Sequence, residues 1–146
     1  MFMKCVAVSL MSTSIVVALA AQSAQPAPAK GVLHDITVTA DDVYTGTITL
    51  DVTAGKVTGR MLLTAPTGVT GDVAGTAKEG ALVLEFPFHM TAQECDGVVR
   101  MNLQVPATPG PTTGTIEAVG CGRDESNKIT GTVELKPAAQ KPGAGR

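Results

Sequence analysis

The sequence predicts an all-β protein, a single antiparallel meander of about eight strands that forms a small barrel or a strongly curled sheet. Three observations predict this class. Apolar and polar residues alternate with a period of two over most of residues 32–136, and no segment with helical periodicity exceeds two turns. Short glycine-containing turns separate the alternating runs, and further glycines recur inside them. A β-sandwich is the alternative architecture.

The alternation defines the strands in chain order. A weaker first strand is expected near residues 32–38. The second, 44–52, places Tyr44, Ile48 and Leu50 on one face and threonines on the other, which is typical of a half-buried antiparallel strand. The same pattern predicts further strands over residues 56–63, 69–78, 82–90, 98–105, 113–120 and 129–136.

The turn signals between these runs are short. They are Ala54-Gly55, the segment from Ala65 to Gly68, Glu79-Gly80, Asp96-Gly97 and the segment from Pro106 to Gly114. Since short connections join neighbouring antiparallel strands, consecutive strands are expected to pair in sequence order.

Glycines inside the strands favour a barrel over a sandwich. They fall on the apolar face, where glycine weakens a flat strand but permits the sharp coiling that closes a sheet on itself. The residues concerned are Gly46, Gly59, Gly71, Gly75 and Gly131.

The chain ends predict export. Residues 1–20 read as a signal peptide, with Lys4 before an apolar run and small residues around a cleavage site after Ala20 or a few residues later. A retained anchor is the alternative, although the run is short and carries serines and a threonine. Residues 21–31 are expected to be a Pro/Ala-rich linker, 32–136 the β domain and 137–146 a flexible tail. The mature protein is therefore expected to be secreted or periplasmic, with no membrane span.

Composition excludes several function classes. The whole chain carries a formal charge of −2, and the cationic residues form no cluster, so nucleic acid is not an expected partner. After signal removal only Tyr44, Phe86 and Phe88 are aromatic, which leaves little for stacking on bases or sugars. Three aromatic residues also cannot build the two girdles of an outer-membrane barrel.

Cys95 and Cys121 are the two cysteines that remain after signal removal, and they are expected to form a disulfide. They are equidistant in sequence from Thr108, in the loop between two predicted strands, so they would face each other at the open end of that hairpin. Cys121 is out of phase with the inward residues of its strand, so a bulge at Gly97 or Gly120 is expected as well.

No catalytic or metal-binding constellation is predicted. Ser23 and Ser126 lack the turn that presents a serine nucleophile. His34 and His89 lie on separate strands, and even with Asp35 or Glu85 they do not form a convincing zinc set. The acidic pairs in predicted loops lack calcium-binding spacing and are expected to be solvated turns: Asp41 with Asp42, Glu94 with Asp96, and Asp124 with Glu125.

The expected function is therefore non-enzymatic and cofactor-free. An exported barrel that encloses a cavity would be suited to a small apolar ligand. The alternative is a cell-envelope or surface interaction module that binds a protein through its loops or an edge strand. An enzyme ranks third and would require one of the histidines to meet two other polar side chains in a pocket.

Overall fold

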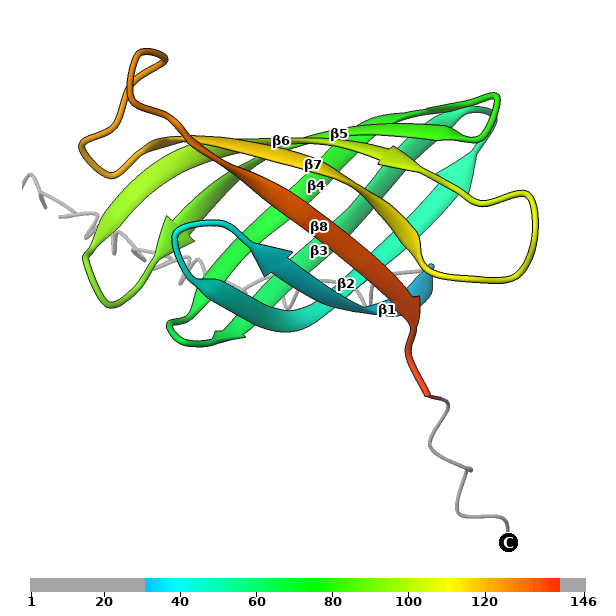
Figure 1. The fold of residues 1–146 in the computed structure, drawn as a ribbon, viewed down its shortest axis with the longest axis horizontal. Helices are drawn as coiled ribbons and strands as arrows, with labels where there is room; N and C mark the ends of the chain where they lie inside the picture. The colour runs from blue at the N-terminus through cyan, green and yellow to red at the C-terminus, as the bar shows by residue number, and fades with distance from the viewer. Residues whose placement is uncertain (1–30, 140–146) are drawn as a thin grey trace, which may run out of the picture.

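The eight strands form one closed antiparallel barrel in which every strand pairs with its neighbours in sequence and β1 also pairs with β8 (Figure 1). The computed structural model describes residues 31–139, which contain no helix long and apolar enough to cross a bilayer. The predicted signal peptide at 1–20, nearly all of the linker and the last residues of the tail lie outside this range. The strands are β1 Val32–Thr39, β2 Val43–Thr53, β3 Lys56–Ala65, β4 Val69–Lys78, β5 Ala81–Met90, β6 Cys95–Gln104, β7 Thr112–Gly120 and β8 Ile129–Pro137.

Apolar side chains fill the interior, and the opposite face of each strand carries mainly threonine and charged residues, as the alternation predicts. Among the described residues, no polar or charged residue is fully buried. The most completely buried side chains are Ile36, Ile48, Val57, Met61, Leu84, Phe86, Met101, Leu103 and Leu135.

The two ends of the barrel differ. The end that we call the closed end carries the tight β2–β3 and β4–β5 turns, the β6–β7 loop and both ends of the described chain. Ala54 and Gly55, like Glu79 and Gly80, have positive φ at both central positions, which is the type I′ geometry that suits two-residue hairpins. The other end, which we call the mouth, carries the β1–β2, β3–β4, β5–β6 and β7–β8 loops.

Glycine allows neighbouring strands to approach closely, and this confirms the barrel over the sandwich. A Cβ atom added at Gly59 would lie 1.8 Å from the Thr49 carbonyl oxygen, and one added at Gly114 would lie 1.9 Å from that of Asn102. Neither position has room for a side chain. The same crowding by backbone oxygen recurs at Gly46, Gly71, Gly75, Gly97 and Gly131.

One predicted turn is wrong. Asp96 and Gly97 lie inside β6, paired with His89 and Phe88 of β5, and the chain reverses earlier, over residues 91–94. Two physical reasons explain the difference. Asp96 points outward and contacts His89 across the strands, and Gly97 occupies an inward site beside the Phe88 ring, where an added Cβ would come within 2.5 Å of ring carbons.

The Cys95–Cys121 disulfide is present at the mouth, with a Cα–Cα separation of 5.2 Å. The register pairs Gly97 with Gly120, so the ladder alone would leave the two cysteines one residue out of step. The predicted bulge is absent from the β6–β7 ladder; instead, positive φ at Gly120 and Cys121 turns the chain out of β7 and brings the two cysteines together. The Cys121 amide still donates to the Asp96 carbonyl, at 3.1 Å, so the backbone remains tied to β6.

Candidate functional site

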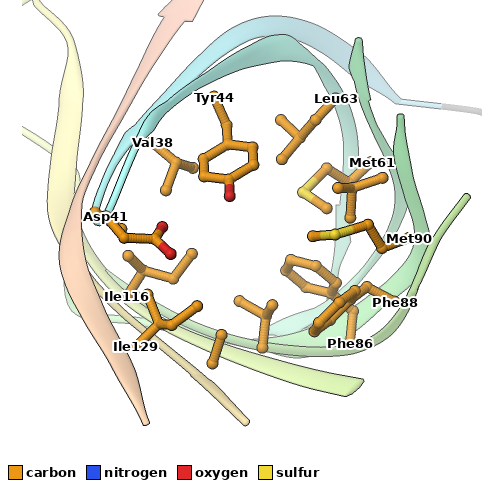
Figure 2. Close-up of a pocket in the computed structure, with 14 residues that line it drawn as sticks. Val38, Asp41, Tyr44, Met61, Leu63, Phe86, Phe88, Met90, Ile116 and Ile129 are labelled. Carbon is orange, nitrogen blue, oxygen red and sulfur yellow. The ribbon is translucent and has the colours of Figure 1, made fainter. Parts of the chain in front are cut away.

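Inward side chains line a cavity in the barrel interior toward the mouth (Figure 2), while inward residues nearer the closed end, such as Val57 and Leu103, are fully buried. This inner cavity has a volume of about 70 Å³. Its wall is almost entirely aliphatic, aromatic and thioether, with Phe86 and Met61 among its most deeply buried members. The other apolar wall residues are Val38, Ala40, Leu63, Val69, Phe88, Met90, Val99, Ile116, Ala118 and Ile129.

The inner cavity continues outward into a wider vestibule of about 350 Å³. The two adjoin at the mouth, where they share six wall residues: Asp41, Tyr44, Phe88, Met90, Ala118 and Ile129. The vestibule is more polar, because its wall adds Gln93, Arg123 and the chain around the disulfide. A ligand that enters here passes from a polar rim to an apolar interior.

We define the rim by three polar side chains, Asp41, Tyr44 and Arg123; the neutral Gln93 also lines the vestibule. Asp41 and Tyr44 line both spaces, and their carboxylate and hydroxyl groups point into the space that the lining side chains surround (Figure 2). Arg123 lines only the vestibule, with one guanidinium nitrogen 3.9 Å from the Asp41 carboxylate and another donating to the Asn127 carbonyl at 3.4 Å. The rim therefore presents an anion, a cation and a phenol around one opening.

The environment of Tyr44 raises the pKa of its phenol above the ordinary value of 10.0. Partial burial is the main cause, because it disfavours the charged phenolate. The negative charges of Asp41 and Asp42 and the hydrogen-bonding contact with Asp41 add to this effect, while the Arg123 charge opposes it. The phenol therefore remains protonated at neutral pH and is available as a hydrogen-bond donor.

Because Tyr44 is the only tyrosine, its titration can be followed by ultraviolet absorbance alone. We expect Asp41→Asn to lower the pKa of Tyr44 toward 10.0, since it removes a negative charge and a carboxylate contact. Burial remains, so the pKa stays above 10.0. Asp51→Asn, toward the far end of β2, is the matched control and should not change it. Equal pKa values in the Asp41→Asn variant and the unmodified protein would contradict this account of the rim.

The β7–β8 loop, residues 121–128, is braced against the barrel. Arg100 on β6 contacts both Glu85 and Glu125 at 3.0 Å, and Lys128 contacts Glu117 at 3.0 Å and Glu125 at 3.7 Å. Exposed pairs contribute little singly, but this network and the disulfide fix the loop at both ends. They thereby position Arg123 beside the mouth.

The two histidines do not meet. His34 is the third residue of β1, near the closed end, where burial lowers its pKa below the ordinary 6.5, and it pairs with Ile48 and Pro137. His89 lies on the outer face near the mouth, with its Nδ1 atom 3.0 Å from Asp96. Within residues 31–139 no group of three or more His, Cys, Asp or Glu side chains is arranged to hold a metal ion.

The acidic pairs and Ser126 have separate roles. The Ser126 hydroxyl donates to the Asp124 carboxylate at 2.6 Å, and this contact is the main cause that lowers the pKa of Asp124. Asp42 accepts a hydrogen bond from the Val43 amide, which is typical turn chemistry. Ser23 lies outside the described residues.

The prediction treated Asp41 and Asp42 alike and therefore missed the rim. Asp41 faces the mouth instead, 3.9 Å from an arginine that lies far along the chain. One signal in the sequence was available: Asp41 stands three residues before Tyr44, which is the first inward residue of β2. Arg123 had no comparable signal, because its position depends on how the β7–β8 loop folds.

Comparison with protein-family models, with curated proteins and with solved structures yields no match to this chain.

Proposed function

We propose that this protein is an exported, non-enzymatic binding protein that takes a small apolar ligand through the mouth of the barrel. The observation that carries the proposal is a cavity with an almost wholly apolar wall, which lies in the barrel interior toward the mouth and adjoins a more polar vestibule there. A polar rim around an apolar pocket is typical of small-molecule sites. The disulfide supports an oxidising compartment, hence a secreted or periplasmic location.

The size of the inner cavity limits the ligand and its affinity. A volume of about 70 Å³ suits a short alkyl chain or the edge of a ring, with the rest of the ligand in the vestibule. Each buried methylene contributes roughly 0.8 kcal/mol, so about five of them, divided between the inner cavity and the vestibule, give about 4 kcal/mol, which corresponds to a dissociation constant near 1 mM. Binding should therefore be sought at millimolar ligand.

Filling the cavity provides the test. Ala118 is an inward residue of β7 that lines both the cavity and the vestibule. We expect Ala118→Leu to weaken binding of cyclohexane or hexanol at least about tenfold, because the new side chain occupies the space of about two buried methylenes. Calorimetry measures the affinity, and fluorescence of the single tyrosine, Tyr44 at the rim, reports the same event.

The matched control is Ala74→Leu, an alanine of β4 that is exposed on the outer face. This variant should bind both probes like the unmodified protein. The proposal is wrong if neither probe binds the unmodified protein at millimolar concentration, or if Ala74→Leu and Ala118→Leu weaken binding equally.

A second candidate is a protein-interaction module of the cell envelope. Each of the eight strands already has two neighbours, so no strand edge is free for strand addition, and this candidate depends on the loops. The braced loop at residues 121–128 favours it, because a fixed loop loses little entropy on binding. Retention of one envelope protein by the unmodified barrel, but not by a variant with this loop shortened, would support it.

A further inference from the structure

The polar residues of the rim indicate which head group the ligand carries. This inference rests on the proposed function, in which the cavity binds a small apolar ligand. Asp41 and Tyr44 line the inner cavity as well as the vestibule. They are its polar members, so a ligand whose apolar part fills the cavity places its own polar group against them. Arg123 lines the vestibule only, beside Asp41, with a guanidinium nitrogen 3.9 Å from the Asp41 carboxylate.

Asp41 and Arg123 form a loose ion pair, so a polar group beside them can hydrogen-bond to both. Their closest charged atoms are 3.9 Å apart, which is longer than a charge-assisted hydrogen bond of about 2.8 Å. Both side chains are about half exposed, at 47% and 46%, so neither is desolvated by the other. The carboxylate thus keeps the capacity to accept, and the guanidinium keeps the capacity to donate.

The two charges also compensate each other. A carboxylate ligand would be attracted by Arg123 but placed beside Asp41, and an ammonium ligand would be attracted by Asp41 but placed beside Arg123. A neutral group that both donates and accepts meets no like charge. It can donate to Asp41 and accept from Arg123 or from the Tyr44 hydroxyl.

We propose that the ligand is a neutral amphiphile, a short apolar body that carries a hydroxyl or primary amide group, and that the Asp41–Arg123 pair selects it over charged homologues. The apolar wall supplies most of the affinity, and the rim supplies the discrimination. A charged head group would leave one rim charge facing a like charge.

The experiment compares hexanol, hexanoate and hexylamine by calorimetry at neutral pH, where the three share one alkyl chain and differ in head-group charge. The unmodified protein should bind hexanol about tenfold more tightly than either charged ligand, since one unpaired like charge near the rim is worth on the order of tenfold in affinity. Equal affinity for all three ligands would overturn the head-group proposal and leave the apolar-ligand function standing. Failure of all three to bind would overturn both.

Two variants should reverse the preference in opposite directions. Asp41→Asn leaves Arg123 uncompensated, so hexanoate becomes the tightest ligand of the three. Arg123→Gln leaves Asp41 uncompensated, so hexylamine does. A preference for hexanol that persists in both variants would overturn the role of the pair.

The outer face provides a matched control for net charge. Arg60 and Asp72 pair across β3 and β4 at 3.8 Å, almost the same separation as the rim pair, and both are exposed. Arg60→Gln and Asp72→Asn change the net charge as the rim variants do, yet they should leave the order of the three ligands unchanged. If they shift it as much as the rim variants, the selection arises from overall charge and the proposal is wrong.

Discussion

Removing the disulfide, as Cys95→Ala with Cys121→Ala, should lower the free energy of unfolding by about 3 to 4 kcal/mol. The two cysteines are 26 residues apart in the sequence. A crosslink over that span lowers the entropy of the unfolded chain by an amount that corresponds to this free energy. For a domain of this size the melting temperature should fall by about 10 to 20 °C. Chemical denaturation and thermal melting monitored by circular dichroism measure both quantities.

The loss of stability on removing the disulfide should be largest at the mouth. The disulfide joins the start of β6 to the residue that follows β7, so amides near residues 120–123 should exchange hydrogen faster in the variant, while the closed end stays protected. The unmodified protein under a reducing agent is the second measurement and should behave like the double variant. An unchanged melting temperature in both would contradict the structural role of the crosslink.

Phe86→Ala should destabilise the protein by about 3 to 5 kcal/mol, the usual cost of truncating a buried phenylalanine. Phe86 has no solvent exposure and lies where the packed interior meets the inner cavity. Removal of the ring enlarges the inner cavity. The barrel cannot contract to fill the space, because hydrogen bonds already fix the neighbouring strands. Denaturant unfolding measures the change.

Ligand rescue distinguishes this loss from general misfolding. Benzene should raise the melting temperature of Phe86→Ala more than that of the unmodified protein, since it can occupy the volume that the ring leaves. Val83→Ala is the control on the same strand: Val83 is 51% exposed, and its truncation should cost no more than about 0.5 kcal/mol. A variant that remains folded but gains nothing from benzene would contradict the enlarged cavity.

The alternation of residues was enough to predict the strands, their order and the face that each buries. For example, Ile48 and Leu50 are buried where the pattern places them, while Thr47 and Thr49 point away from the core. The inward glycines were enough to favour closure. These features are local, because they depend on side-chain direction and on the space beside one backbone position.

The residues that line the cavity could not be predicted from the sequence, because they depend on how far along the barrel axis each inward side chain lies. Leu84 and Ala118 are both inward residues, yet Leu84 is part of the packed interior and Ala118 lines the cavity and the vestibule. Depth is set by strand tilt and register around the whole barrel, which period-two patterning does not specify. The incorrect prediction of a turn at Asp96-Gly97 has a related cause. Pairing with β5 keeps these two residues in a strand although their local sequence favours a turn.

The two ends of the described chain leave the barrel at the end opposite the mouth, where His34 pairs with Pro137 (Figure 1). A fusion partner, affinity tag or solid support joined directly at Gly31 or Ala139 would therefore begin on the side away from the opening. Attachment at these two positions would hold the barrel for surface-based sensing with the mouth free for small molecules.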